Sequence, residues 1–106
     1  MLKLYGTPAC PYCKDCKENF DRVGIEYEYI DIMGELRNLG EFLALRDKNP
    51  VFDHSKEIED IGVPALMKED GTVFLDWEGY MKDLGYEPEY HYINEVPSCS
   101  LDGKGC

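Results

Sequence analysis

The stretch that decides the fold of this chain is Cys10-Pro11-Tyr12-Cys13, which follows the short apolar run Leu2-Lys3-Leu4-Tyr5. The apolar run predicts a first strand, and the segment from Cys10 through Val23 predicts a helix. Cys10 then falls at the N-cap and Pro11 at the first helical position, where the missing N–H of proline costs nothing. A Cys-x-x-Cys between a strand and a helix near the start of a βαβ pattern is typical of thiol–disulfide redox chemistry.

The expected position of Cys10 predicts how it reacts. The first turn of a helix has unpaired backbone N–H groups and the positive end of the macrodipole, and both stabilise a thiolate. A free thiol has a pKa near ~8.5, and helix N-termini and Cys-x-x-Cys motifs lower it to roughly 3.5–7.5. We therefore predict that Cys10 is the nucleophile. Cys13, one turn further on, is placed to attack a mixed disulfide at Cys10 and is the predicted resolving thiol.

Two metal-binding alternatives use the same cysteines. Half of a zinc site would need two more Cys or His ligands, and the body of the sequence has no second paired motif of that kind. Cys10, Cys13 and Cys16 could instead form a C-x2-C-x2-C ligand set for an iron–sulfur cluster. However, Cys16 belongs to an apolar helical stripe with Cys13, Phe20 and Val23, which explains it as a core residue. We therefore expect no metal.

Composition limits the classes of function. A length of 106 residues suits one domain. The net charge of −11, from 22 acidic and 11 basic residues, disfavours nucleic acid and anionic membranes as partners, although it can steer basic surfaces. The chain has neither an apolar run long enough for a membrane span nor an N-terminal signal peptide. We expect a cytoplasmic protein, in which reducing conditions favour cysteines that cycle over a permanent disulfide.

The remaining sequence predicts the element order β-α-β-α-β-β-α. After the first helix, which ends at Gly24, the predicted elements are a strand at 25–32, a helix at 35–47, a short helical piece at 55–60, strands at 65–68 and 72–75, and a last helix at 77–84 that Asp76 caps and Gly85 closes. Asp70-Gly71 predicts a hairpin between the last two strands. The first two strands form a parallel βαβ unit, which predicts a four-stranded mixed sheet with helices on both faces.

Apolar periodicity predicts which residues face the core. In the helix at 35–47 the predicted apolar face consists of Leu36, Leu39 and Leu43. In the last helix it consists of Trp77, Tyr80 or Met81, and Leu84. His54 lies in a loop, and we expect it to be exposed to solvent.

The character of the sequence changes after residue 85. We expect a folded domain over residues 1–85 and a C-terminal extension over residues 86–106 that is partly disordered. Tyrosines in the first part of the extension are candidates to anchor it to the domain. Cys99 and Cys106 lie near the chain end, and pairing with each other, exchange with the active site, metal binding and no role at all stay open.

Tyr5, Cys10-Pro11-Tyr12-Cys13 and Gly62-Val63-Pro64, in this order within the predicted elements, resemble the glutaredoxin family of the thioredoxin superfamily over about residues 1–85. The resemblance implies a thioredoxin fold and a cis bond between Val63 and Pro64. It implies that the Val63 backbone pairs with a bound peptide or with glutathione. It also implies that Pro11, Tyr12, Val63 and Pro64 lie at the substrate, and that Asp76 can hold the amino end of glutathione.

Three positions depart from the family pattern. Thr7 and Gly62 stand where many members have Lys and Thr, respectively. Residues 74–77 read Phe-Leu-Asp-Trp, without the glycine pair that many members have there. The sequence therefore indicates a divergent, glutaredoxin-related branch.

Four hypotheses about function follow. The first is a monomeric thiol–disulfide oxidoreductase that reduces protein or glutathione mixed disulfides, with glutathione as the reductant. The second is a glutathione-independent electron donor to a specific enzyme, such as a ribonucleotide reductase or a peroxidase, which a flavoprotein reductase would recharge. The third is an iron–sulfur or metal carrier that uses Cys10 across a dimer, against which Pro11 counts. The fourth is a non-catalytic interaction module.

Overall fold

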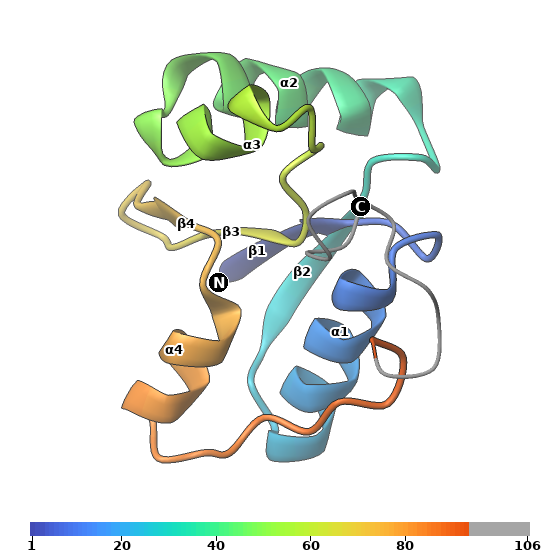
Figure 1. The fold of residues 1–106 in the computed structure, drawn as a ribbon. Coiled ribbons are helices and arrows are strands. Elements are labelled where there is room, and N and C mark those ends of the chain that lie inside the picture. Colours follow the sequence, from blue (N-terminus) through green and yellow to red (C-terminus); the bar gives the residue numbers. More distant parts are fainter. Residues whose placement is uncertain (94–106) are drawn as a thin grey trace.

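The computed structural model describes residues 1–93, and at its centre lies a four-stranded sheet (Figure 1). The strands are β1 (Leu2–Gly6), β2 (Tyr27–Asp31), β3 (Ala65–Met67) and β4 (Val73–Phe74), arranged in the order β2-β1-β3-β4. β1 is parallel to β2 and antiparallel to β3, and β3 is antiparallel to β4. The predicted mixed sheet and its last hairpin are therefore confirmed.

Helices cover both faces of this sheet (Figure 1). α1 (Pro11–Val23) and α4 (Trp77–Asp83) lie on one face, and α2 (Leu36–Lys48) and α3 (Asp53–Glu57) lie on the other. A short 3₁₀ turn, η1 (Pro50–Phe52), precedes α3. The element order matches the prediction, although the short helical piece begins a few residues earlier than expected. None of the helices in the described part of the chain combines the length and apolar character that a membrane crossing requires.

The alternation of side chains along β1 divides the core into two clusters. Leu2 and Leu4 point to the α1 and α4 side, whereas Tyr5 points to the α2 side, because successive strand residues face opposite ways. The first cluster is completed by Cys16, Phe20, Leu66, Trp77 and Met81. The second contains Tyr5, Ile30, Ile32, Phe42, Phe52, Val63 and Ala65 together with Cys10 and Cys13. The prediction that Cys16 is a core residue is confirmed.

The predicted apolar face of α2 is wrong in part. Leu36 is 86% exposed and Leu43 is 42% exposed, whereas Phe42 is fully buried. Leu36 is the first residue of the helix. The buried face is centred on Phe42, whose ring contacts Tyr5 and Phe52 at centroid distances of 6.1 and 5.7 Å. Leu39 packs beside it and is partly buried.

Two further predictions need correction at the ends of elements. Leu84 is 51% exposed, because α4 ends at Asp83 and the next residue no longer faces the core. β2 begins at Tyr27 and not at residue 25, because the backbone N–H of Ile25 still bonds Phe20 O in the C-terminal cap of α1. Gly24, in the left-handed region with φ +80°, forms that cap as predicted.

The chain after α4 turns back and runs along α1 (Figure 1). The structure describes this segment as far as residue 93. The predicted disorder at the end of the extension, and the alternatives for Cys99 and Cys106, lie outside the described residues.

Gly62, the residue before Val63-Pro64, has a backbone that only glycine adopts easily. Its φ is +94°, and a Cβ there would lie 2.8 Å from a ring carbon of Phe52. This geometry explains why the threonine that many family members have is absent from this position.

We expect Gly62→Ala to lower the free energy of unfolding by about 2–4 kcal/mol, since left-handed strain adds to overpacking against Phe52. Gly71→Ala is the matched control, because Gly71 has φ +91° but open space around it. It should lose only about 1 kcal/mol. Urea unfolding of both variants measures the difference, and equal losses would show that the Phe52 contact is unimportant.

Candidate active site

The turn between β1 and α1 sets the position of the Cys-x-x-Cys motif. The backbone N–H of Cys10 donates to Thr7 O at 3.1 Å, and the N–H of Ala9 donates to Thr7 Oγ1 at 3.2 Å. Thr7 is buried, and its hydroxyl accepts a hydrogen bond within the turn. The lysine that many glutaredoxins have at this position would instead extend toward solvent. Cys10 is the N-cap of α1 and Pro11 its first residue, as predicted.

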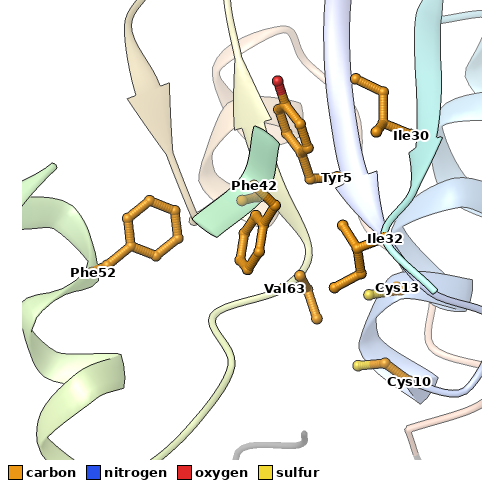
Figure 2. Close-up of a cluster of buried hydrophobic side chains, with 9 residues drawn as sticks. Tyr5, Cys10, Cys13, Ile30, Ile32, Phe42, Phe52 and Val63 are labelled. Carbon is orange, nitrogen blue, oxygen red and sulfur yellow. The ribbon is translucent and has the colours of Figure 1, made fainter. Parts of the chain in front are cut away.

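Cys10 and Cys13 are thiols packed at the edge of the core cluster that contains Ile32 and Val63. Their side chains are 0% and 1% exposed, respectively. Figure 2 shows both sulfurs on the side of α1 that faces Ile32 and Val63. A Cβ at Gly6 would lie 3.2 Å from Cys13 Sγ, so the glycine allows the first turn of α1 to approach the end of β1.

The two cysteines have different roles in proton binding. The hydrogen bond of Cys13 with Cys10 raises the pKa of Cys13 well above its usual range, and burial and the charge of Cys10 raise it further. A hydrogen bond with the Thr7 backbone opposes these effects. Cys13 therefore keeps its proton at neutral pH.

A groove of about 520 Å³ lies beside the motif. The predicted residues Tyr12, Val63, Pro64 and Asp76 all line this groove, which we call the Pro64 groove. The bond between Val63 and Pro64 is cis, which confirms the expectation from the resemblance. Tyr12 comes from α1, Val63 and Pro64 precede β3, and Asp76 caps α4 by accepting the Gly79 N–H at 3.0 Å.

The Pro64 groove also contains residues that the sequence did not reveal. His54 is exposed, as predicted, but it lies in α3 and not in a loop, and it stands on the groove wall with Asp60 and Glu78. Trp77, which is 2% exposed, contributes to the groove and to the core. No local pattern marks these residues, because α3, the loop before β3 and α4 meet only in the folded chain. Among the described lining residues there is no Lys or Arg.

A metal centre finds no support in the described residues. Within residues 1–93, no group of three or more His, Cys, Asp or Glu is arranged to hold a metal ion. Cys16 packs in the core cluster opposite that of Cys10 and Cys13. Burial raises the pKa of the Cys16 thiol, as it does for an inert core cysteine.

A cysteine pair at the start of α1, set beside a cis-proline on a mixed four-stranded sheet, defines a thiol–disulfide oxidoreductase-like protein with a thioredoxin fold. The comparisons with known proteins agree with this class. The family model for glutaredoxin matches residues 2–48. The chain is a divergent, glutaredoxin-related protein.

Two relatives show this divergence. An uncharacterized protein of Haemophilus influenzae is 38% identical over 73 residues, which cover 69% of this chain and 85% of the relative. An uncharacterized glutaredoxin-like 8.6 kDa protein in the rubredoxin operon of Clostridium pasteurianum is 29% identical over 51 residues, or 48% of this chain and 68% of the relative. No solved structure matches the chain.

We expect Cys10→Ser to speed the alkylation of Cys13 by iodoacetamide about tenfold or more at neutral pH. The substitution removes the thiol and the charge that raise the pKa of Cys13, and each unit of pKa changes the thiolate fraction tenfold. Peptide mapping by mass spectrometry measures the rate. Cys16 is the internal control, because burial is the main cause of its raised pKa. An unchanged rate at Cys13 would mean that Cys10 does not govern its protonation.

Proposed function

We propose that this protein reduces protein disulfides or glutathione mixed disulfides in the cytoplasm through Cys10 and Cys13, acting as a monomer. The observation that carries this proposal is the hydrogen bond from the Cys13 thiol to Cys10 at the N-terminus of α1. It stabilises a thiolate on one sulfur and keeps a proton on the other. The match to the glutaredoxin family model supports the same class of chemistry.

The reaction takes two exchange steps. The Cys10 thiolate attacks one sulfur of the substrate disulfide, so that a mixed disulfide forms at Cys10 and the other substrate sulfur leaves as a thiolate. Cys13 then loses its proton and attacks the Cys10 sulfur, or an incoming thiol attacks the mixed disulfide. The second substrate thiol is released reduced. In the dithiol route, Cys10 and Cys13 end as a disulfide, and an external thiol reductant returns two electrons.

The Pro64 groove is the proposed substrate site. An extended peptide or glutathione would pair with the Val63 backbone next to the cis-proline, in the manner of an added strand. Pro11 and Tyr12 would flank the substrate sulfur, since Tyr12 lines the groove and Pro11 precedes it in α1. In this arrangement the Asp76 carboxylate can receive the amino end of glutathione.

The reductant depends on the charge of the Pro64 groove. Carboxylates of Asp60, Asp76 and Glu78 line it, and the described lining residues include one imidazole, that of His54, but no Lys or Arg. Glutathione carries two carboxylates and one ammonium group, so this lining repels its net charge. The acidic lining favours the second candidate, a donor to a specific protein that a flavoprotein reductase recharges. Glutathione is the proposed reductant only if the contact with Asp76 outweighs the repulsion.

We expect Cys10→Ser to abolish reduction of a glutathione mixed disulfide, because Cys10 is the one thiol of residues 1–93 that stands at the N-cap of α1, where a thiolate is stabilised. Cys13→Ser should retain activity with glutathione as the only reductant, since an incoming thiol can resolve the mixed disulfide. A coupled assay of the three proteins measures both effects. Cys16→Ala serves as a control outside the site. An active Cys10→Ser variant would contradict the proposed nucleophile.

The Asp76→Asn variant separates the two reductants. Asparagine keeps the N-cap of α4, so the substitution removes charge with little effect on the helix. If Asp76 holds the amino end of glutathione, the KM for a glutathione mixed disulfide should rise roughly fivefold, which corresponds to ~1 kcal/mol for one charge contact in water. Asp83→Asn, at the exposed end of α4, is the matched control. A fall in KM would instead favour the glutathione-independent donor.

A further inference from the structure

The acidic side chains of the Pro64 groove come from two separate parts of the chain. Asp60 lies in the segment that leads to the cis-proline, whereas Asp76 and Glu78 stand at the start of α4. Against these carboxylates, the described lining residues offer one imidazole, that of His54, and no Lys or Arg. The groove beside the cysteine motif therefore has a negative lining.

The Asp76 carboxylate has a fixed position. Its Oδ1 atom accepts the Gly79 N–H at 3.0 Å. A Cβ at residue 79 would overlap this carboxylate, so the glycine leaves the space that Asp76 occupies. Within residues 1–93, neither Asp76 nor Glu78 forms an ion pair with Lys or Arg. Both carboxylates can therefore pair with a cation that enters the groove.

The segment after α4, residues 87–93, is bound along α1 (Figure 1). Asn19 accepts the Glu89 N–H at 2.8 Å and donates to Glu89 O at 2.7 Å. The Asp15 carboxylate, which is 1% exposed, accepts the backbone N–H groups of residues 91–93 at 2.8 to 3.3 Å. These are charge-assisted hydrogen bonds, which are stronger than neutral ones. The path of the backbone is thus fixed on both sides of the residue between the two anchors.

The residue between these anchors is Tyr90, and its side chain reaches α4. The Tyr90 ring packs against Trp77 at a centroid distance of 6.2 Å, and its hydroxyl donates to Glu78 Oε2. Burial and the hydrogen bond with Glu78 raise the pKa of Tyr90, so the hydroxyl keeps the proton that it donates. Glu78 is half-buried and is therefore held at the groove by a residue from outside α4.

Carboxylates that are held beside a reacting sulfur attract a positively charged substrate. One close contact between unlike charges in water strengthens binding about fivefold. Because hydrogen bonds already order Asp76 and Glu78, little side-chain entropy is lost when a cation binds. A Lys or Arg within two positions of the substrate cysteine lies within about 7 Å of it along an extended chain. That distance is shorter than the screening length of about 8 Å at physiological ionic strength, so salt weakens the attraction only in part.

We propose that the Pro64 groove selects disulfides of basic protein segments, which have Lys or Arg within two positions of the reacting cysteine. Asp76 and Glu78 are the specificity-determining residues, and Tyr90 positions Glu78. This inference rests on the proposed function of Cys10 as the nucleophile. The chemical step is unchanged, since a bond forms between Cys10 and one sulfur of the segment while the other substrate sulfur leaves as a thiolate.

The net charge of −11 attracts basic substrates in general, so the groove has to be separated from the rest of the surface. Glu26 provides the matched control. It is exposed and lies next to the start of β2, whereas the cysteine motif follows the end of β1. Because β1 and β2 are parallel, the two positions are at opposite ends of the sheet, about 13 Å apart along the strands. Glu26→Gln removes the same charge as Glu78→Gln without changing the groove.

The test uses the full chain with Cys13→Ser, in which Cys13 cannot resolve a mixed disulfide at Cys10. The probes are symmetrical disulfides of the end-blocked tripeptides Lys-Cys-Lys, Gln-Cys-Gln and Glu-Cys-Glu. Peptide mapping by mass spectrometry measures the rate of adduct formation at Cys10, and the rate of each probe with dithiothreitol corrects for its intrinsic reactivity. We expect the corrected rate for the Lys probe to exceed that for the Gln probe about tenfold, and the Glu probe to be slowest.

Substitutions in this background assign the preference to residues. Glu78→Gln and Asp76→Asn should each lower the ratio of the Lys rate to the Gln rate about threefold, whereas Glu26→Gln should leave it nearly unchanged. Tyr90→Phe keeps the ring against Trp77 and removes the hydroxyl, so it should lower the ratio about twofold.

The contrary outcomes are distinguishable. Equal corrected rates for the three probes would overturn this inference and leave the proposed nucleophile intact. An equal loss of preference in Glu26→Gln and Glu78→Gln would show attraction by the total charge and overturn the assignment to the groove. An unchanged ratio in Tyr90→Phe would overturn its positioning role. If no probe forms an adduct at Cys10, the proposed function itself fails, and this inference fails with it.

Discussion

The site depends on the contact between Gly6, at the end of β1, and Cys13, in the first turn of α1. A Cβ at residue 6 would lie 3.2 Å from the Cys13 sulfur and 3.3 Å from a side-chain carbon of Leu4, which is tighter than ordinary van der Waals contact. With glycine there, α1 begins directly over the strand end. The antiparallel pairing of Tyr5 with Ala65 then brings the cis-proline, Pro64, to the same end of the sheet. Two motifs far apart in the sequence thus meet through backbone pairing.

The pair of thiols works by asymmetry of environment. Cys13 has its proton held by the hydrogen bond with Cys10 and by burial, while Cys10 stands at the N-terminus of α1, where helix N–H groups favour negative charge. The groove beside them is lined by carboxylates of Asp60, Asp76 and Glu78. In the proposed function, the motif determines the chemistry, whereas the groove determines which disulfide gains access to it.

The face of α1 that points away from the sheet binds the C-terminal segment. Asp15, Asn19 and Arg22 lie three to four residues apart, so they form one polar stripe along the helix. That stripe binds the backbone of residues 87–93 and leaves the inner face of α1 to Cys16 and Phe20 in the core. One helix thus contacts the sheet, carries Cys13 and binds the C-terminal segment. Because these contacts go to backbone groups, they fix the path of the segment and depend little on its side chains.

Signals that act within one or two turns could be interpreted from the sequence alone. The Cys10 N-cap, Pro11 and the Gly24 cap each depend on neighbouring backbone, and the element order followed from them and from apolar periodicity. Only the tertiary structure decided which face of α2 is buried, why Gly62 replaces a larger residue, and that Asp60 and Glu78 share a groove with Tyr12. The reason is physical. A helix is buried on the face that its neighbours cover, and the residues that line a groove or bind the C-terminal segment are close only after the chain has folded.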